Sequence, residues 1–277
     1  MNPYQAHAEK TARLQQQFVA VGPGLRLGKA SSNLFRDRRP ATGTRLDVRA
    51  FDAVLGVDAQ QGWVDVEGMT PYDLLTAATL THQLMPAVVP QLKSITIGGA
   101  AAGVGIEATS FRQGLVHETL LELEVLVGDG RVLTCTPDNE YNDLFFAFPN
   151  SYGSLGYALR LKARTLPVQP FVRVEHRRYH DAGAFFADLE TRCNGEADFI
   201  DGVVFGPDEF YLNQARFVDS APRVSDYTYR DIYYRSIRDK PVDHLKTRDY
   251  IWRWDTDWFW CSKNVGAQHP LLRRLYG

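Results

Sequence analysis

Apolar and polar residues alternate along several segments of the chain, and this period-two pattern predicts β-strands with one buried face. The alternation runs on both sides of a turn at Gln60–Gly62 within residues 51–68. It recurs over residues 120–137, where Gly128-Asp129-Gly130 separates two runs rich in Leu and Val. Both segments are therefore predicted to form β-hairpins.

Helical patterns precede and follow these hairpins. Residues 5–19 are rich in Ala and Gln, and residues 70–84 begin with Thr70 as a predicted N-cap and Pro71 in the first turn. Residues 138–167 predict a short helix, a glycine-rich turn and a strand. Strands and helices do not alternate regularly enough for a doubly wound parallel sheet, so the fold class is predicted to be α+β.

A second α+β unit is predicted to begin near residue 168, after the sequence "PVQP". Residues 171–180 have the pattern of a strand, and residues 181–193 that of an amphipathic helix with Phe185, Phe186 and Leu189 on one face. Residues 198–219 predict two strands around a Gly-Pro-Asp turn.

Composition narrows the classes of function. Hydrophobic residues make up 44% of the 277 residues and the net charge is −2, which gives no global attraction to nucleic acid. The three cysteines are far apart, and His176 and His180 lie in a predicted strand, so neither a disulfide scaffold nor a metal site is expected. No apolar run has the length of a transmembrane helix, and the N-terminus lacks the apolar segment of a signal peptide. A cytoplasmic protein is predicted, with peripheral membrane contact left open.

Residues 90–114, "PQLKSITIGGAAAGVGIEATSFRQG", are unusually small and polar. The pair Gly98-Gly99 permits positive φ and lets a ligand approach the backbone, and consecutive N–H groups form an anion-binding concavity. The alternative is a loop or helix whose glycines serve tight packing. The spacing excludes the G-x-G-x-x-G dinucleotide fingerprint and the Lys-[ST] of a P-loop.

Residues 90–137 closely resemble the flavin-contacting segment of the vanillyl-alcohol oxidase/p-cresol methylhydroxylase (PCMH) superfamily of FAD proteins. The family pattern P-x-x-x-x-x-T-[IV]-G-G, then small residues, G-x-x-[ST]-x-x-x-G and a hairpin, is present from Pro90 to Pro137. A second match, "NDLFFAFPNSYGSLGYALRLKART", follows in the family's order and at its distance. The sequence features "TIGGAAAGVGIEATS" and "LRLGKASSNLFR" are most similar to the Delta(24)-sterol reductase group.

The resemblance implies three regions: an N-terminal extension (residues 1–23), a PCMH-type FAD-binding domain (24–167) and a partial substrate domain (168–277). It implies an FAD-dependent oxidoreductase that transfers hydride between flavin and a hydrophobic alkene. NAD(P)H is implied as electron donor. Because relatives continue beyond residue 277, the substrate domain is expected to be incomplete here.

The resemblance also implies which residues contact FAD. Backbone N–H groups of the first segment are expected to face the flavin or its pyrophosphate: Thr96, Ile97, Gly98 and Gly99. The resemblance implies that the cofactor-contacting surface continues through Gly103, Gly105, Glu107, Thr109 and Ser110. Gly114 is implied to let the chain turn away from the cofactor into the next strand. The adenine side is implied to lie near Gly153, Ser154, Leu155 and Gly156, with Val125 and Leu126 as its wall.

The sequence differs from the family pattern at the phosphate loop. Many relatives have an Arg-Gly-x-Gly-His/Ser loop whose His can attach to flavin, whereas residues 26–36 contain neither His nor Cys. FAD is therefore expected to bind non-covalently, with Ser31-Ser32-Asn33 as a candidate phosphate contact or a solvated turn. Two alternatives stay open for the function: an FAD-linked oxidase or dehydrogenase of a sugar-like or polyol alcohol, and a flavin-binding fragment without turnover.

Tryptophans gather in "YIWRWDTDWFWCSKNVG", residues 250–266. On a strand Trp252, Trp254 and Trp258 face one way, as an aromatic wall for a flat apolar substrate, unless they pack in a core. Arg253, Asp255 and Asp257 would face the other way and, with Tyr152, are candidates for moving or orienting a proton. The mixed charges of residues 223–253 are typical of a solvated face.

Overall fold

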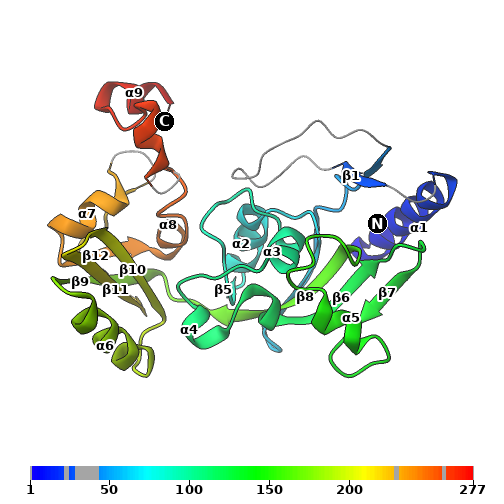
Figure 1. The fold of residues 1–277 in the computed structure, drawn as a ribbon, viewed down its shortest axis with the longest axis horizontal. Coiled ribbons are helices and arrows are strands. Elements are labelled where there is room, and N and C mark those ends of the chain that lie inside the picture. The colour runs from blue at the N-terminus through cyan, green and yellow to red at the C-terminus, as the bar shows by residue number, and fades with distance from the viewer. Residues whose placement is uncertain (1, 22–24, 29–43, 228–230, 258–259, 277) are drawn as a thin grey trace. The chain divides into compact units, whose positions relative to one another are not determined.

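The computed structural model describes residues 2–21, 25–28, 44–227, 231–257 and 260–276. The chain divides into two compact units, shown in Figure 1. Unit 1 comprises Met1–Pro90, Ser94–Ile106 and Gly114–Pro167, and unit 2 comprises Gln91–Lys93, Glu107–Gln113 and Val168–Gly277. Two short pieces of the glycine-rich stretch are thus packed with the C-terminal unit.

Unit 1 is built on an antiparallel sheet with the strand order β3-β4-β8-β6-β7, in which β5 also pairs with β8. Its strands are β3 (Val54–Asp58), β4 (Trp63–Glu67), β5 (Leu84–Pro86), β6 (Leu120–Leu126), β7 (Val132–Cys135) and β8 (Tyr157–Pro167). A separate parallel pair is formed by β1 (Arg26–Gly28) and β2 (Arg45–Asp47). The helices are α1 (Pro3–Val21), α2 (Tyr72–Leu80), α3 (Ile97–Gly103), η1 (Val116–Thr119) and α5 (Asn142–Ala147).

Both predicted hairpins are confirmed, as β3-β4 and β6-β7. The predicted N-cap of α2 is wrong. Pro71 occupies that position without a side-chain cap, and the Thr70 hydroxyl instead donates to the carbonyl of Ala53 at 3.4 Å. The entry to α2 is fixed by the backbone, since the N–H of Tyr72 donates to the carbonyl of Ile95.

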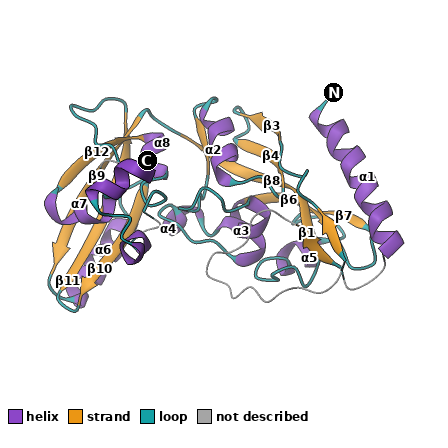
Figure 2. Cartoon of the chain, turned by 90° about the horizontal axis from the view of Figure 1, so that it is seen from above, coloured by secondary structure: helices purple, strands orange, loops and turns teal. Residues whose placement is uncertain are grey.

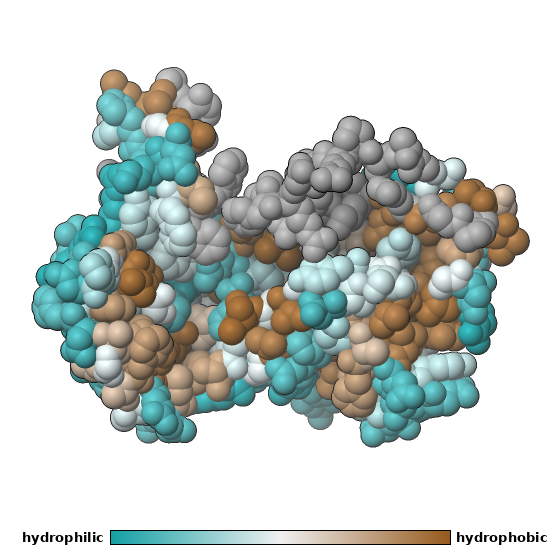
Figure 3. Space-filling model, viewed as in Figure 1, coloured by the Kyte–Doolittle hydropathy of each residue, from teal (hydrophilic) through white to brown (hydrophobic). Residues whose placement is uncertain are grey.

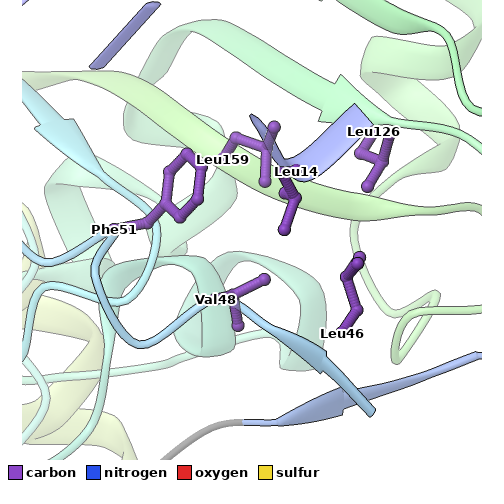
Figure 4. Packing of buried hydrophobic residues seen from close by; sticks show 6 residues of the cluster. All are labelled: Leu14, Leu46, Val48, Phe51, Leu126 and Leu159. Carbon is purple, nitrogen blue, oxygen red and sulfur yellow. The ribbon is translucent and has the colours of Figure 1, made fainter. Parts of the chain in front are cut away.

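The core below α1 joins segments that are far apart in sequence. Leu14 of α1 packs with Leu46, Val48, Phe51, Leu126 and Leu159, all buried (Figure 4). Figure 2 shows α1 beside the sheet of unit 1. Since burying one such side chain contributes about 1.5–3 kcal/mol, this cluster attaches α1 firmly to the sheet.

A buried ion network also attaches α1. Nδ1 of His7 lies 2.8 Å from Glu67 Oε1 and Nε2 lies 2.8 Å from Glu124 Oε1, while Lys10 Nζ is 2.5 Å from Glu67 Oε2. Burial opposes the charge on His7, but the hydrogen bonds to Glu124 and Glu67 outweigh it and raise the pKa of His7 to about 9. His7 is therefore protonated at neutral pH and bridges two carboxylates.

We expect the protein to lose stability as the pH rises through about 9, the pKa of His7 in the folded state. Because this pKa lies above that of an unfolded histidine, the stabilisation is complete below the unfolded value and disappears as His7 loses its proton. The melting temperature should fall by several degrees between pH 7 and pH 10. His7→Gln should melt lower at pH 7 and lose less over the same range. Equal losses in both proteins would contradict this assignment.

Unit 2 contains a four-stranded sheet with the order β10-β11-β9-β12, all pairs antiparallel. Its strands are β9 (Phe171–Tyr179), β10 (Phe199–Gly206), β11 (Glu209–Val218) and β12 (Val242–Lys246). Its helices are α4 (Ser110–Gln113), α6 (Ala182–Cys193), α7 (Tyr233–Asp239), α8 (Thr247–Ile251), η2 (Cys261–Val265) and α9 (Pro270–Tyr276). The predicted strands and helix of residues 171–219 are confirmed.

The two faces of this sheet are different. On one face Phe185 of α6 packs with Ala197, Ile200, Phe210 and Leu212. Figure 1 shows α7 and α8 on the side opposite α6, where aromatic and polar residues of the sheet are buried. In the described part of the chain, no helix has the length and apolar character needed to cross a bilayer, and no group of three or more metal-ligating side chains lies together.

Candidate cofactor-binding site

The N-terminus of α3 is closed by the chain itself. Thr96 caps the helix by accepting the N–H of Gly99 at 3.2 Å. The N–H of Ile97 donates to the carbonyl of Thr70 at 3.0 Å, and that of Gly98 to the carbonyl of Gly68 at 2.9 Å. Each of these three N–H groups therefore already has an acceptor within the protein, and the contact of this segment with the cofactor stays a prediction.

Gly98 serves close packing. A Cβ at this position would lie 2.6 Å from the carbonyl oxygen of Gly68, and one on Gly68 would lie 2.0 Å from the carbonyl oxygen of Ala158. The N–H of Gly68 also donates to the carbonyl of Leu159 on β8 at 2.8 Å. Two glycines thus let the start of α3 lie directly against the central strand of the sheet. This close contact fixes the position of α3 on the sheet.

The far end of α3 meets the second glycine-rich segment. The N–H of Tyr152 donates to the carbonyl of Ala102 at 3.1 Å, and its hydroxyl donates to the carbonyl of Gly103 at 3.4 Å. Residues 103–106 and 150–156 therefore form one structure, which we call the glycine loops. Sequence matching predicted both segments, and the structure shows that Tyr152 joins them.

The glycine loops are conformationally strained. Of the four non-glycine residues with positive φ in the described part of the chain, three lie in these loops: Val104 at 59°, Asn150 at 59° and Tyr152 at 50°. A β-branched residue such as Val104 rarely adopts this conformation, which costs of the order of 1–3 kcal/mol. Strain of this kind is concentrated at functional sites in proteins.

The exposed surface beside the loops suits a flat ligand. Gly99 is exposed, although a Cβ there would lie 2.9 Å from Thr96 Oγ1, while one on Gly103 would meet only the ring of Tyr152, at 3.7 Å. The loops also expose large apolar side chains: Ile106 at 72%, Tyr152 at 56% and Leu155 at 41%. Figure 3 shows apolar residues on this face of unit 1 among polar ones. Bare backbone beside exposed apolar side chains fits a cofactor that lies on the backbone.

Several other predicted contacts serve the fold. A Cβ on Gly105 would lie 2.8 Å from Val116, and one on Gly156 would lie 2.5 Å from the carbonyl oxygen of Leu126. Gly114 has a φ of +80°, as expected for a residue that turns the chain. Both donors of Ser154 bond to the carbonyl of Ser151. Val125 and Leu126, the predicted adenine wall, are both buried, and Leu126 belongs to the core cluster below α1, a position that favours packing within unit 1.

Glu107, Thr109 and Ser110 are packed in unit 2. The Ser110 hydroxyl accepts the N–H of Glu107 at 2.9 Å, and Thr109 is buried. Glu107 Oε1 accepts the N–H of Gln91 at 3.2 Å, and burial raises the pKa of Glu107 to about 8. A carboxyl group with this pKa is mostly protonated at pH 7.

The predicted strand through the tryptophans is wrong. The segment after β12 forms α8 and a run of turns. Trp252, Arg253 and Trp254 are all buried, so they do not alternate between two faces. Trp254 packs edge-on against Tyr233, with ring centroids 4.9 Å apart. This geometry favours packing within unit 2 over an aromatic wall.

The predicted proton-moving carboxylates near these tryptophans have fixed partners. Asp255 accepts the N–H of Lys93 at 2.8 Å, and Asp257 pairs with Arg273 at 2.5 Å. Trp258 and Ser31-Ser32-Asn33 lie outside the described residues.

Sequence reasoning missed a polar row across the sheet of unit 2. Asp201 on β10, Asn213 on β11 and His176 on β9 lie opposite one another in register. Asn213 donates its amide N–H to Asp201 and accepts Nδ1–H of His176 at 2.7 Å. The row ends at Arg253, whose Nη2 is 2.6 Å from Asp201 Oδ2. Period-two alternation predicted the strands, but it contains no signal for hydrogen bonds between side chains on three neighbouring strands.

The polar row is buried and rich in aromatic contacts. The Arg253 guanidinium lies 3.9 Å from the centre of the Tyr250 ring and 5.3 Å from that of Tyr233. Burial lowers the pKa of His176, so its ring is neutral at pH 7 with the proton on Nδ1. His176 Nε2, Arg253 Nε and the Tyr250 hydroxyl have no hydrogen-bond partner among the described residues. Buried polar atoms in this condition often mark a functional site.

Comparison with known proteins points to a flavin protein. Residues 10–136 match the family described as "FAD binding domain". The chain is 24% identical over 253 residues to Delta(24)-sterol reductase of Pisum sativum, a match covering 83% of this chain and 45% of the pea protein. It is 25% identical over 238 residues to Delta(24)-sterol reductase of Homo sapiens, covering 81% of this chain and 46% of the human protein.

A further match is to a protein named for a different activity. Cytokinin dehydrogenase 7 of Oryza sativa subsp. japonica is 32% identical over 171 residues, covering 58% of this chain and 32% of the rice protein. The chain spans about half the length of the sterol reductases that it matches.

Proposed function

We propose that this chain, whose residues 10–136 match the FAD-binding domain family and whose sequence resembles PCMH-type FAD proteins, is part of an FAD-dependent oxidoreductase acting on a hydrophobic alkene. The observation that carries the proposal is the pair of strained glycine loops, joined by Tyr152 beside exposed, bare backbone. The Delta(24)-sterol reductases matched over four-fifths of the chain support the choice of an alkene, because their name implies reduction of a double bond.

Unit 1 would hold the cofactor through backbone and apolar contacts. Gly99 and Gly103 present backbone that carries no side chain of its own, while Tyr152 and Leu155 expose apolar groups to which a flat ring could bind. When bound, FAD supplies the capacity to accept and donate hydride; the protein binds and orients it. The surrounding hydrogen bonds hold Val104 and Tyr152 in their strained conformations, so the loops need less ordering on binding.

The cofactor is expected to bind without a covalent bond, because the segment that resembles the family's phosphate loop has no His or Cys. Acid precipitation of the purified protein should release essentially all flavin absorbance into the supernatant. Flavin that stays with the precipitated protein would contradict non-covalent binding.

The electron donor is proposed to be NAD(P)H, and the direction of reaction is a reduction. Anaerobic addition of NADPH should bleach the flavin absorbance, and a Δ24-unsaturated sterol should then restore it. Bleaching by a polyol alcohol but not by NADPH would instead support an alcohol oxidase or dehydrogenase.

The match to a cytokinin dehydrogenase favours a dehydrogenase as the second candidate. The third alternative is flavin binding without turnover. It is distinguished from the other two by bound flavin that neither NADPH nor an alcohol reduces.

A further inference from the structure

The polar row of unit 2 lies among buried polar atoms to which the fold gives no hydrogen-bond partner. Among the described residues these atoms include Nε2 of His176, Nε of Arg253 and the hydroxyl of Tyr250. The three residues are 6%, 4% and 1% exposed, so bulk solvent does not reach them. Buried polar atoms of folded proteins nearly always have a partner, either in the protein or in an ordered bound molecule. The three atoms therefore indicate a bound molecule inside unit 2.

The hydrogen bonds of the polar row determine what His176 offers to such a molecule. The carboxylate of Asp201 can only accept, so the amide N–H of Asn213 faces it and the Asn213 oxygen faces His176. Nδ1 of His176 therefore carries a proton and donates it to that oxygen at 2.7 Å. Burial lowers the pKa of His176, so the ring is neutral and Nε2 carries a lone pair. The ring thus presents an acceptor, and its partner must bring a hydrogen.

The other two atoms are donors, and their side chains belong to the same packed group as His176. The His176 ring packs edge-on against Tyr233 of α7, with ring centroids 5.8 Å apart. The Arg253 guanidinium lies 5.3 Å from the centre of the Tyr233 ring and 3.9 Å from that of Tyr250. One acceptor and two donors without partners are thus held in one group of side chains, on the face of the sheet that α7 and α8 cover in Figure 1.

The charges in this group favour a neutral molecule. Arg253 pairs with Asp201 at 2.6 Å, so their charges cancel. Burial raises the pKa of the Tyr233 and Tyr250 hydroxyls, which keep their protons. His176 is neutral as well, so the group has no net charge with which to hold an ion. A neutral molecule that both donates and accepts hydrogen bonds fits these atoms, and water is the smallest such molecule.

We propose that unit 2 encloses a binding site for water within this group of side chains. One water molecule donates a hydrogen bond to Nε2 of His176, and the same water or a second one accepts from Arg253 Nε–H and the Tyr250 hydroxyl. The water links β9 to α8 and to the turn that follows it. Buried waters make about three hydrogen bonds each and belong to the folded structure. The site is contained in unit 2 and does not depend on the proposed function.

Nuclear magnetic resonance of the whole chain with isotope-labelled histidine tests the site in solution. Long-range hydrogen–nitrogen correlations at pH 7 should show a proton on Nδ1 of His176 and none on Nε2. The ring protons of His176 should show a nuclear Overhauser effect to water with the sign of a long-lived complex. His180, an exposed histidine just after the same strand, should lack this signal.

Tyr233→Phe is the matched variant, because a hydroxyl proton that exchanges with solvent could imitate the signal of bound water. The variant keeps the ring that packs against His176 and lacks the hydroxyl, so the Overhauser effect should persist. A crystal structure of the wild type should show a water oxygen about 2.7–3.2 Å from His176 Nε2. Loss of the effect in Tyr233→Phe, a proton on Nε2, or a direct bond from Nε2 to a protein donor would overturn the proposal.

Discussion

Gly98→Ala is expected to destabilise the protein by about 3 kcal/mol, because its new methyl group overlaps backbone atoms that have no room to move. The Cβ would lie 2.6 Å from the carbonyl oxygen of Gly68 and 3.2 Å from its carbonyl carbon. Gly68 is itself bonded to Leu159 on β8, so relief of the clash would disturb the central strand. Urea unfolding measures the effect.

Gly103→Ala is the matched control on the same helix. Its methyl group would lie 3.7 Å from the ring of Tyr152, which is ordinary contact, and alanine favours helix more than glycine does. Its stability should stay within about 0.5 kcal/mol of the wild type. If both variants were equally destabilised, the close approach of α3 to the sheet would not be the reason for Gly98.

Arg253→Met is expected to cost about 3–5 kcal/mol, since it leaves the largely buried carboxylate of Asp201, 16% exposed, without its countercharge. Removing both charges in Arg253→Met/Asp201→Asn should restore most of the loss, because the side-chain carbonyl oxygen introduced on β10 would still accept the amide N–H of Asn213. Thermal unfolding of the wild type, the single variant and the double variant measures this recovery.

The control for this series is Arg216→Met on the exposed surface of β11, which should change stability by less than about 0.5 kcal/mol. A double variant as unstable as Arg253→Met would mean that Arg253 stabilises unit 2 through its stacking on Tyr250 rather than through Asp201.

The predicted hairpins and the α+β class follow from one physical rule, the burial of one face of each strand. The same rule fails at residues 250–260. Alternation predicts that Arg253 lies opposite the tryptophans, on a solvated face. Arg253 is instead buried and pairs with Asp201, which lies 52 positions away in the sequence. Pairing with so distant a residue overrides the local pattern, and a single sequence contains no signal for it.

The roles of the individual glycines also could not be predicted from the sequence. Gly98 and Gly99 are neighbours with the same predicted role, but Gly98 packs against Gly68 while Gly99 is exposed. Only the position of Gly68 distinguishes them, and this depends on how β4, β8 and α3 come together. The contribution of Tyr152 to the site was equally hidden, because its two hydrogen bonds reach a helix that ends 49 residues earlier.

The central claim is that FAD lies on the glycine loops of unit 1. Hydrogen exchange of the apoprotein with and without added FAD tests it most directly, since bound cofactor should slow exchange at the backbone it covers. The account predicts protection in peptides spanning residues 99–106 and 150–156, with little change in β10 and β11. Absence of flavin binding, or protection confined to other peptides, would contradict it.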